Sequence, residues 1–126
     1  MALSAGSTFL LPVRMEWKNH LFIVLFDPNP RRETVIVNLT TAKPHSDRTT
    51  VLQQGEHPFI NRETIANYLD AAIADVDKLE QAIRGIGEIR EPTTPELLSK
   101  LRSGLLASTL TKNKVKSFVK SQALPG

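Results

Sequence analysis

The sequence predicts a mainly β fold, a small barrel or curled sheet with a short helix and a C-terminal helical extension. In the first half of the chain, short apolar or β-branched segments follow one another with turn residues between them. The connections have no room for crossover helices, so adjacent strands are expected to be antiparallel. Beyond Glu91 the apolar residues change to helical spacing. These observations together favour a small β domain followed by helices.

Four short strands are expected before residue 60. The second is a continuous apolar run too short to favour a helix, and we expect it to be buried on both faces. Pro12 ends the first strand, because proline tolerates a strand edge but not a strand interior. The expected strands are Ser7–Val13, Leu21–Phe26, Thr34–Thr40 and Thr49–Leu52. A sheet of such strands removes its exposed edges by curling or closing.

The segment Glu63–Ile86 admits two interpretations. Its Ala, Leu, Ile, Asp and Glu residues suit one long helix, which Gly85-Ile86-Gly87 would end. A helix from about Asp75 to Arg84, preceded by strands through Ile65–Tyr68 and Ala71–Ala74, fits the same residues. Local sequence leaves both alternatives open.

A boundary at Glu91-Pro92 divides the chain into a β domain, residues 1–91, and a helical extension, residues 92–126. Thr94 is a good N-cap and Pro95 suits the first helical position, so a helix is expected from there to about Ala107. A second helix is expected from Thr111 to about Gln122, with its apolar residues on one face and lysines on the other.

The composition suits one domain of 126 residues with an aliphatic core. The absence of cysteine excludes disulfides and thiolate chemistry. No apolar stretch approaches the roughly 20 residues that span a membrane, and no signal peptide is recognisable, so a cytoplasmic protein is expected.

The net charge of +3 is unevenly distributed along the chain. Residues 1–91 carry −2 (ten basic, twelve acidic) and residues 92–126 carry +5 (six basic, one acidic). The lysines of the extension are compatible with binding to phosphates, with binding to an acidic protein, or with simple exposure to solvent.

The three histidines, His20, His45 and His57, all fall at the edges of predicted strands. Imidazole titrates near neutral pH and is the usual proton carrier in metal-free catalysis. Their spacings of 25 and 12 residues match no metal-binding motif, and no phosphate loop or nucleophile elbow is present. We therefore predict no metal or other cofactor. His57 lies in Gly55-Glu56-His57-Pro58, where Phe59 and Ile60 are expected to anchor the loop in the core.

The order of these segments resembles that of the PemK/MazF toxin family. The resemblance covers roughly residues 6–84, with Thr64 nearest to a family serine and Asp77-Lys78-Leu79 nearest to a family helix. The segments that carry it are Gly6-Ser7-Thr8-Phe9, His20–Phe26, Thr34–Thr41, Thr50-Val51-Leu52 and Phe59-Ile60. It implies an SH3-like barrel and favours strands followed by a short helix in Glu63–Ile86. It also implies metal-independent cleavage of single-stranded RNA, an antitoxin protein as partner, and a homodimer.

The family's strand motif of Arg-Pro is replaced here by His20-Leu21, which removes a bidentate phosphate clamp. The resemblance places the family hydroxyl at Thr40 or Thr41. We predict that His20 and His57 form an acid–base pair instead of the arginine, with Thr41 contacting phosphate. The other predicted RNA contacts are Arg14, Thr40, Arg48, Arg62, Lys112, Lys114 and Lys116. The alternative hypothesis is a non-catalytic barrel that binds a protein partner or nucleic acid.

Overall fold

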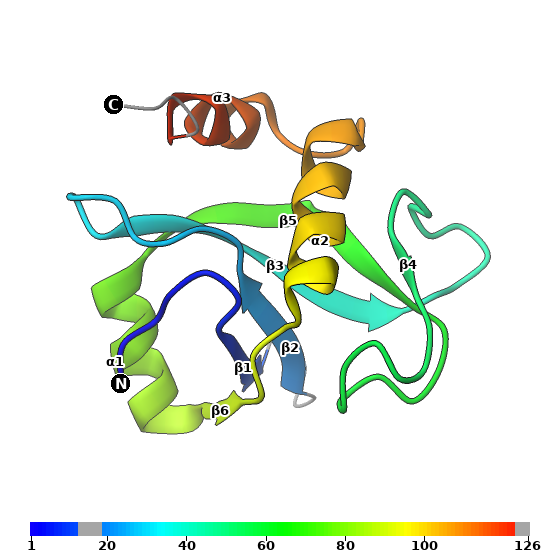
Figure 1. The fold of residues 1–126 in the computed structure, drawn as a ribbon, viewed down its shortest axis with the longest axis horizontal. Helices are drawn as coiled ribbons and strands as arrows, with labels where there is room; N and C mark the ends of the chain where they lie inside the picture. The colour runs from blue at the N-terminus through cyan, green and yellow to red at the C-terminus, as the bar shows by residue number, and fades with distance from the viewer. Residues whose placement is uncertain (13–18, 123–126) are drawn as a thin grey trace.

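The computed structural model describes residues 1–12 and 19–122 and confirms a mainly β fold with a helical extension (Figure 1). A curled, antiparallel six-stranded sheet has the order β4-β5-β3-β2-β1-β6. Its strands are β1 (Thr8–Pro12), β2 (Asn19–Val24), β3 (Glu33–Thr41), β4 (Val51–Leu52), β5 (Thr64–Asp75) and β6 (Glu88–Arg90). The helices are α1 (Val76–Ile86), α2 (Pro95–Ala107) and α3 (Asn113–Gln122).

The segment after residue 63 forms a strand and then a short helix, so the single long helix is wrong. The two strands of the other interpretation join into one, β5, which pairs with β3 along most of its length. Asp75 has an extended backbone, and its carboxylate accepts a hydrogen bond from the Lys78 amide at 3.2 Å. This N-cap satisfies a helix-start amide and places the beginning of α1 directly after the strand.

Strand β6 was not predicted from the sequence. Gly87 ends α1 with an extended backbone, and its amide donates to the Ile83 carbonyl at 2.9 Å. A Cβ atom at residue 87 would lie 2.8 Å from the Leu10 carbonyl oxygen. Glycine therefore allows the chain to approach β1 closely, and the next three residues pair with that strand. The third of them, Arg90, reaches the site described below.

Helices α2 and α3 share one hydrophobic core with the sheet. Buried side chains from both parts form one cluster, including Leu21, Val37, Leu101, Leu105 and Val115. The helix boundaries follow the prediction, with Thr94 as the N-cap of α2, its hydroxyl accepting from the Leu97 amide at 3.1 Å. Residues 92–122 therefore cover one face of the sheet (Figure 1).

A buried hydroxyl network fixes α2 against β5. The Tyr68 hydroxyl donates to the Leu101 carbonyl at 2.9 Å and lies 2.7 Å from Thr50 Oγ1. A Cβ atom at Gly104 would overlap both hydroxyl groups, so glycine is required for this close approach. Burial raises the pKa of Tyr68 to about 12, which keeps the phenol neutral and able to donate.

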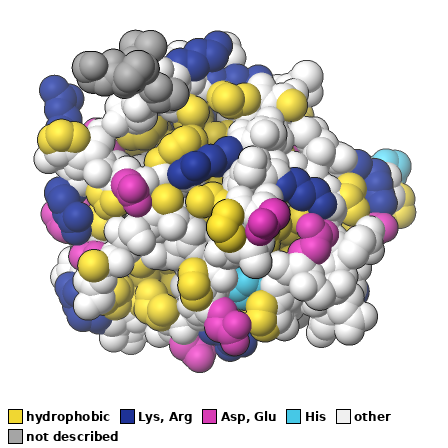
Figure 2. Space-filling view, viewed as in Figure 1, with side chains coloured by type: hydrophobic (Ala, Val, Ile, Leu, Met, Phe, Trp, Pro, Cys, Tyr) yellow, Lys and Arg dark blue, Asp and Glu magenta, His cyan; other side chains and the backbone are white. Residues whose placement is uncertain are grey.

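The opposite face of the sheet carries α1 and the first residues of the chain. A second apolar cluster there contains Leu3, Phe9, Val24, Val76 and Ile83. None of the helices in the described ranges is long and apolar enough to cross a membrane. On the face shown in Figure 2, Lys and Arg side chains are scattered among Asp and Glu instead of forming one continuous basic surface. This face therefore offers no continuous basic surface to an anion.

Candidate functional site

A groove of about 950 Å³ opens at one end of the sheet. We call it the rim groove; it is lined by Asn19 and His20 of β2, Leu39–Thr41 of β3, Lys43, Pro58–Arg62, Thr64 and Arg90. The end of β3 and the loop that joins β4 to β5 lie together on the side of the sheet away from α3 (Figure 1). Strand ends and loops from four parts of the chain therefore meet at this groove.

The rim groove is cationic. Lys43, Arg62 and Arg90 line it, and within residues 1–12 and 19–122 no carboxylate does. Arg62 Nε donates to Asn61 Oδ1 at 3.3 Å, which orients the guanidinium beside an amide. Arg90 lies 3.7 Å from the Glu88 carboxylate, but both side chains are exposed and such pairs hold little energy. Three cations in one groove favour an anionic ligand with several charges.

His20 lies in this groove, as a catalytic role requires. Its side chain is partly buried, and Nδ1 is 3.4 Å from the Leu39 carbonyl oxygen across the β2–β3 pair. In the tautomer with its proton on Nδ1, the ring donates to this carbonyl. An imidazole is the kind of side chain that general acid–base catalysis commonly uses.

Three threonine hydroxyls accompany His20. Thr40 is half-buried, and Thr41, which ends β3, is exposed and therefore accessible to a ligand. The Thr64 hydroxyl donates to the Arg62 carbonyl at 2.9 Å, which ties the Arg62 segment to the start of β5. The structure thus brings together four of the predicted site residues: His20, Thr40, Thr41 and Arg62.

His57 does not share the groove with His20, and this corrects the predicted acid–base pair. The ring is only 3% exposed. Its Nδ1 accepts from the Phe59 amide at 3.0 Å, and its Nε2 lies 2.6 Å from the Glu91 carbonyl oxygen. Both nitrogens are therefore engaged with the backbone, and the ring braces the loop before residue 60 against the segment after β6. A role in acid–base chemistry with His20 required an accessible ring, whereas the ring faces inward.

The two residues expected to anchor this loop in the core behave differently. Ile60 is buried, as predicted, and belongs to the main hydrophobic cluster. Phe59 is 37% exposed and lines the rim groove instead. The guanidinium carbon of Arg90 lies over its ring, 5.9 Å from the ring centroid. The loop is therefore held from inside by Ile60 and His57 and presents Phe59 outward.

Arg48 is engaged outside the groove. Its guanidinium donates to the Glu63 carboxylate, which lowers the pKa of Glu63 below its usual 4.5. The neighbouring Asp47 accepts from Ser108 Oγ at 2.6 Å and from the Thr49 amide at 2.9 Å. These bonds attach the loop after Lys43 to the end of α2.

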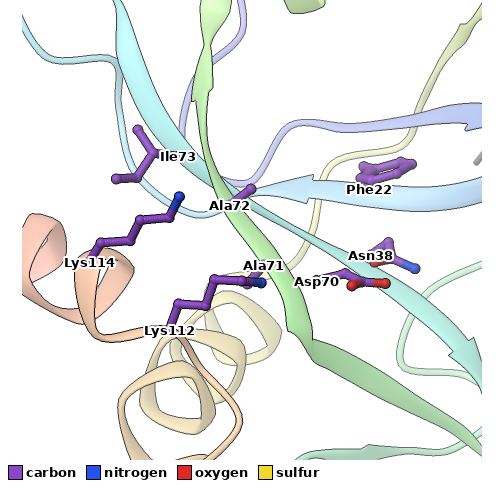
Figure 3. Close-up of a pocket in the computed structure, with 8 residues that line it drawn as sticks. All are labelled: Phe22, Asn38, Asp70, Ala71, Ala72, Ile73, Lys112 and Lys114. Carbon is purple, nitrogen blue, oxygen red and sulfur yellow. The ribbon is translucent and has the colours of Figure 1, made fainter.

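Lys112 and Lys114 line a different, smaller pocket of about 350 Å³ beside β5 and α3 (Figure 3). We call it the α3 pocket; Phe22, Asn38 and Asp70–Ile73 complete it. Lys112 Nζ donates to the Leu69 carbonyl at 2.7 Å. Lys116 of α3 lines neither the groove nor this pocket. The predicted RNA contacts therefore separate into two regions, and Arg14 lies outside the described residues.

Several groove residues were missed by sequence reasoning. Lys43 and Asn61 lie in polar loops, where one lysine or asparagine carries no recognisable signal. Arg90 belongs to the unpredicted strand β6, and Asn19 directly precedes His20. A search for single cations next to strand ends would have found Lys43, but the pairing of β6 with β1 is needed to find Arg90.

Within the described part of the chain, no group of three or more histidine, aspartate or glutamate side chains is arranged to hold a metal ion. Comparison of the whole sequence with protein-family models and with curated proteins finds no match.

Proposed function

We propose that the rim groove binds single-stranded RNA and that the protein is a toxin-like endoribonuclease that cleaves it without a metal. The observation that carries the proposal is the meeting of Lys43, Arg62, Arg90 and His20 in one groove. Cations compensate the phosphate charges, and phosphate contacts supply most of the affinity of such complexes. The groove's volume leaves room for more than one nucleotide unit.

The chemistry assigns the proton transfer to His20. Nε2 accepts the proton of a ribose 2′-hydroxyl, whose oxygen forms a bond to the adjacent phosphorus while the bond from phosphorus to the 5′-oxygen breaks. The products are a 2′,3′-cyclic phosphate and a 5′-hydroxyl, whose proton comes from the His20 imidazolium or from water. Arg62 and Lys43 stabilise the extra negative charge of the five-coordinate phosphorus, and Thr41 donates to a phosphate oxygen. His57 has no part in this step.

The biological setting follows from the family resemblance. A toxin of this type acts in the cytoplasm, as a homodimer, and is held inactive by an antitoxin protein. These three statements are part of the proposal and are supported by the order of strand segments, not by the geometry of the groove.

An assay of RNA cleavage in EDTA tests the proposal. Purified protein should cut single-stranded RNA to fragments with 2′,3′-cyclic phosphate ends, and a fully 2′-O-methylated strand should bind but stay intact. His20→Ala should lower the cleavage rate by roughly 10²- to 10⁴-fold, the usual effect of a general base. His45→Ala is the matched control, because His45 is exposed in a loop outside the groove. Intact RNA, or equal cleavage by His20→Ala, would overturn the enzymatic proposal.

The burial of His57 favours a second candidate, a non-catalytic barrel that binds nucleic acid. A two-histidine site is not assembled, so the groove has one acid–base group where phosphodiester cleavage commonly uses two. This candidate predicts strand binding that weakens steeply with salt and produces no fragments. The same assay, read for bound as well as cleaved strand, separates the two.

A further inference from the structure

Phe59 occupies an unusual position for an aromatic side chain in this protein. Within residues 1–12 and 19–122 it is the only exposed aromatic residue; the others pack in the two apolar clusters or beside them. A single exposed phenylalanine is ordinary in itself, but this one lies in a groove of cations, where its ring offers a flat apolar surface to a ligand.

Arg90 extends this surface. Its guanidinium carbon lies 5.9 Å from the Phe59 ring centroid, and its side chain also lines the groove. An arginine beside an aromatic ring can stack on a planar ligand and pair with an adjacent phosphate at the same time. Nucleotides combine a planar base with a phosphate in just this way.

His57 holds both halves of this arrangement in place. Through Nδ1 it fixes the amide of Phe59, and through Nε2 it bonds the carbonyl of Glu91, the residue after Arg90. The same carbonyl accepts from Thr8 Oγ1 at 2.6 Å, which attaches it to β1. One buried ring therefore sets the backbone positions of two groove residues that lie far apart in the sequence.

We infer that Phe59 and Arg90 form a stacking platform for one base of the bound strand, and that His57 is its positioning residue. The base stacks on Phe59, and its phosphate meets Arg90. Stacking is tolerant of base identity, because every base has a π-face. The inference rests on the proposed binding of single-stranded RNA by the rim groove, whose phosphates Lys43 and Arg62 hold independently of the platform.

The test compares two strands with equal charge at one fixed salt concentration. One is a 2′-O-methylated RNA, and the other is a phosphodiester strand of the same length without bases. The full-length protein should prefer the strand with bases by roughly 5- to 100-fold, the usual contribution of one stacked base. Phe59→Leu should abolish most of this preference, and Phe59→Tyr should keep it. Phe118→Leu, which removes a ring from α3 outside the groove, should leave the preference unchanged.

The role of His57 is tested with the same two strands. His57→Ala should reduce the preference for the strand with bases. The affinity for the baseless strand should fall by less than this preference does, since only the Arg90 phosphate contact is displaced and Lys43 and Arg62 are untouched. An equal preference in wild type and Phe59→Leu would overturn the platform but leave the binding proposal intact. Failure of both strands to bind the wild type, or binding of a protein only, would overturn the binding proposal and the platform with it.

Discussion

The rim groove and the α3 pocket both contain lysine or arginine beside strand residues, yet they differ in what their cations can do. In the groove, Lys43, Arg62 and Arg90 converge with no carboxylate among the described lining residues. In the α3 pocket, Asp70 lines the same space as the lysines, and Lys112 donates to a backbone carbonyl (Figure 3). A dense run of lysines in the sequence is therefore a weaker sign of an anion site than three scattered cations that the fold brings together.

Substituting the cations of each region tests whether the groove and the α3 pocket differ in anion binding. These substitutions should produce the largest change in affinity. Lys43→Ala/Arg62→Ala should weaken binding of a 2′-O-methylated RNA by roughly 10²- to 10⁴-fold, because each of the two charged hydrogen bonds to phosphate contributes about 1.5 to 3 kcal/mol. It should also reduce the dependence of the logarithm of affinity on the logarithm of salt by roughly 1.4, since two phosphate contacts to a single strand are lost. Fluorescence anisotropy across a salt series measures both.

The matched variant is Lys112→Ala/Lys114→Ala, which removes the same total charge from the α3 pocket. We expect less than a threefold loss of affinity, from the weaker long-range field alone. If the two double variants lose affinity equally, the basic helix contributes as much as the groove, and the distinction between the regions fails.

The regular elements were predictable because each has a local signal. The helix from Pro95 follows from its N-cap and leucine stripe, and the central strands follow from runs of apolar and β-branched residues. β6 was missed because only three residues form it and its pairing with β1 depends on the close approach at Gly87. Asp75, by contrast, is where one of the two interpretations of Glu63–Ile86 began a helix, and its cap at the start of α1 confirms that interpretation.

The site was predictable only in part, because the direction of each side chain decides whether that residue lines the groove. His20 and Thr41 lie at strand ends that the sequence identifies, and both line the groove. His57 and Phe59 are two residues apart in one loop, yet one faces the core and the other faces solvent, opposite to expectation. A loop without regular dihedral angles has no periodicity from which its inward and outward positions can be read. The hydrogen bonds of His57 settle this orientation.

The second prediction concerns His57, whose ring connects the backbone of Phe59 to the backbone of Glu91. His57→Ala removes two hydrogen bonds to the backbone and leaves a cavity, so the free energy of unfolding should fall by roughly 2 to 4 kcal/mol. Urea denaturation followed by circular dichroism measures the loss. His45→Ala is the control, because this exposed histidine should change stability by less than about 0.5 kcal/mol. An equal effect of the two substitutions on the free energy of unfolding would show that the hydrogen bonds of His57 do not stabilise this part of the fold.

The smallest expected effect concerns Asp47, which ties the loop of Lys43 to α2 and so connects the groove side with the helical cover. Partial burial raises its pKa, but hydrogen bonds from Ser108 and Thr49 outweigh this and hold the pKa below 3.8. A carboxylate with a lowered pKa contributes stability that is present above pH 3.8 and is lost as the pH falls through the folded-state value. Wild type should therefore exceed Asp47→Asn in stability at pH 7, and the difference should shrink below pH 3.8. Urea midpoints from pH 7 to pH 2.5 measure it, and a difference that stays constant over this range would show that Asp47 acts through its shape and not through its charge.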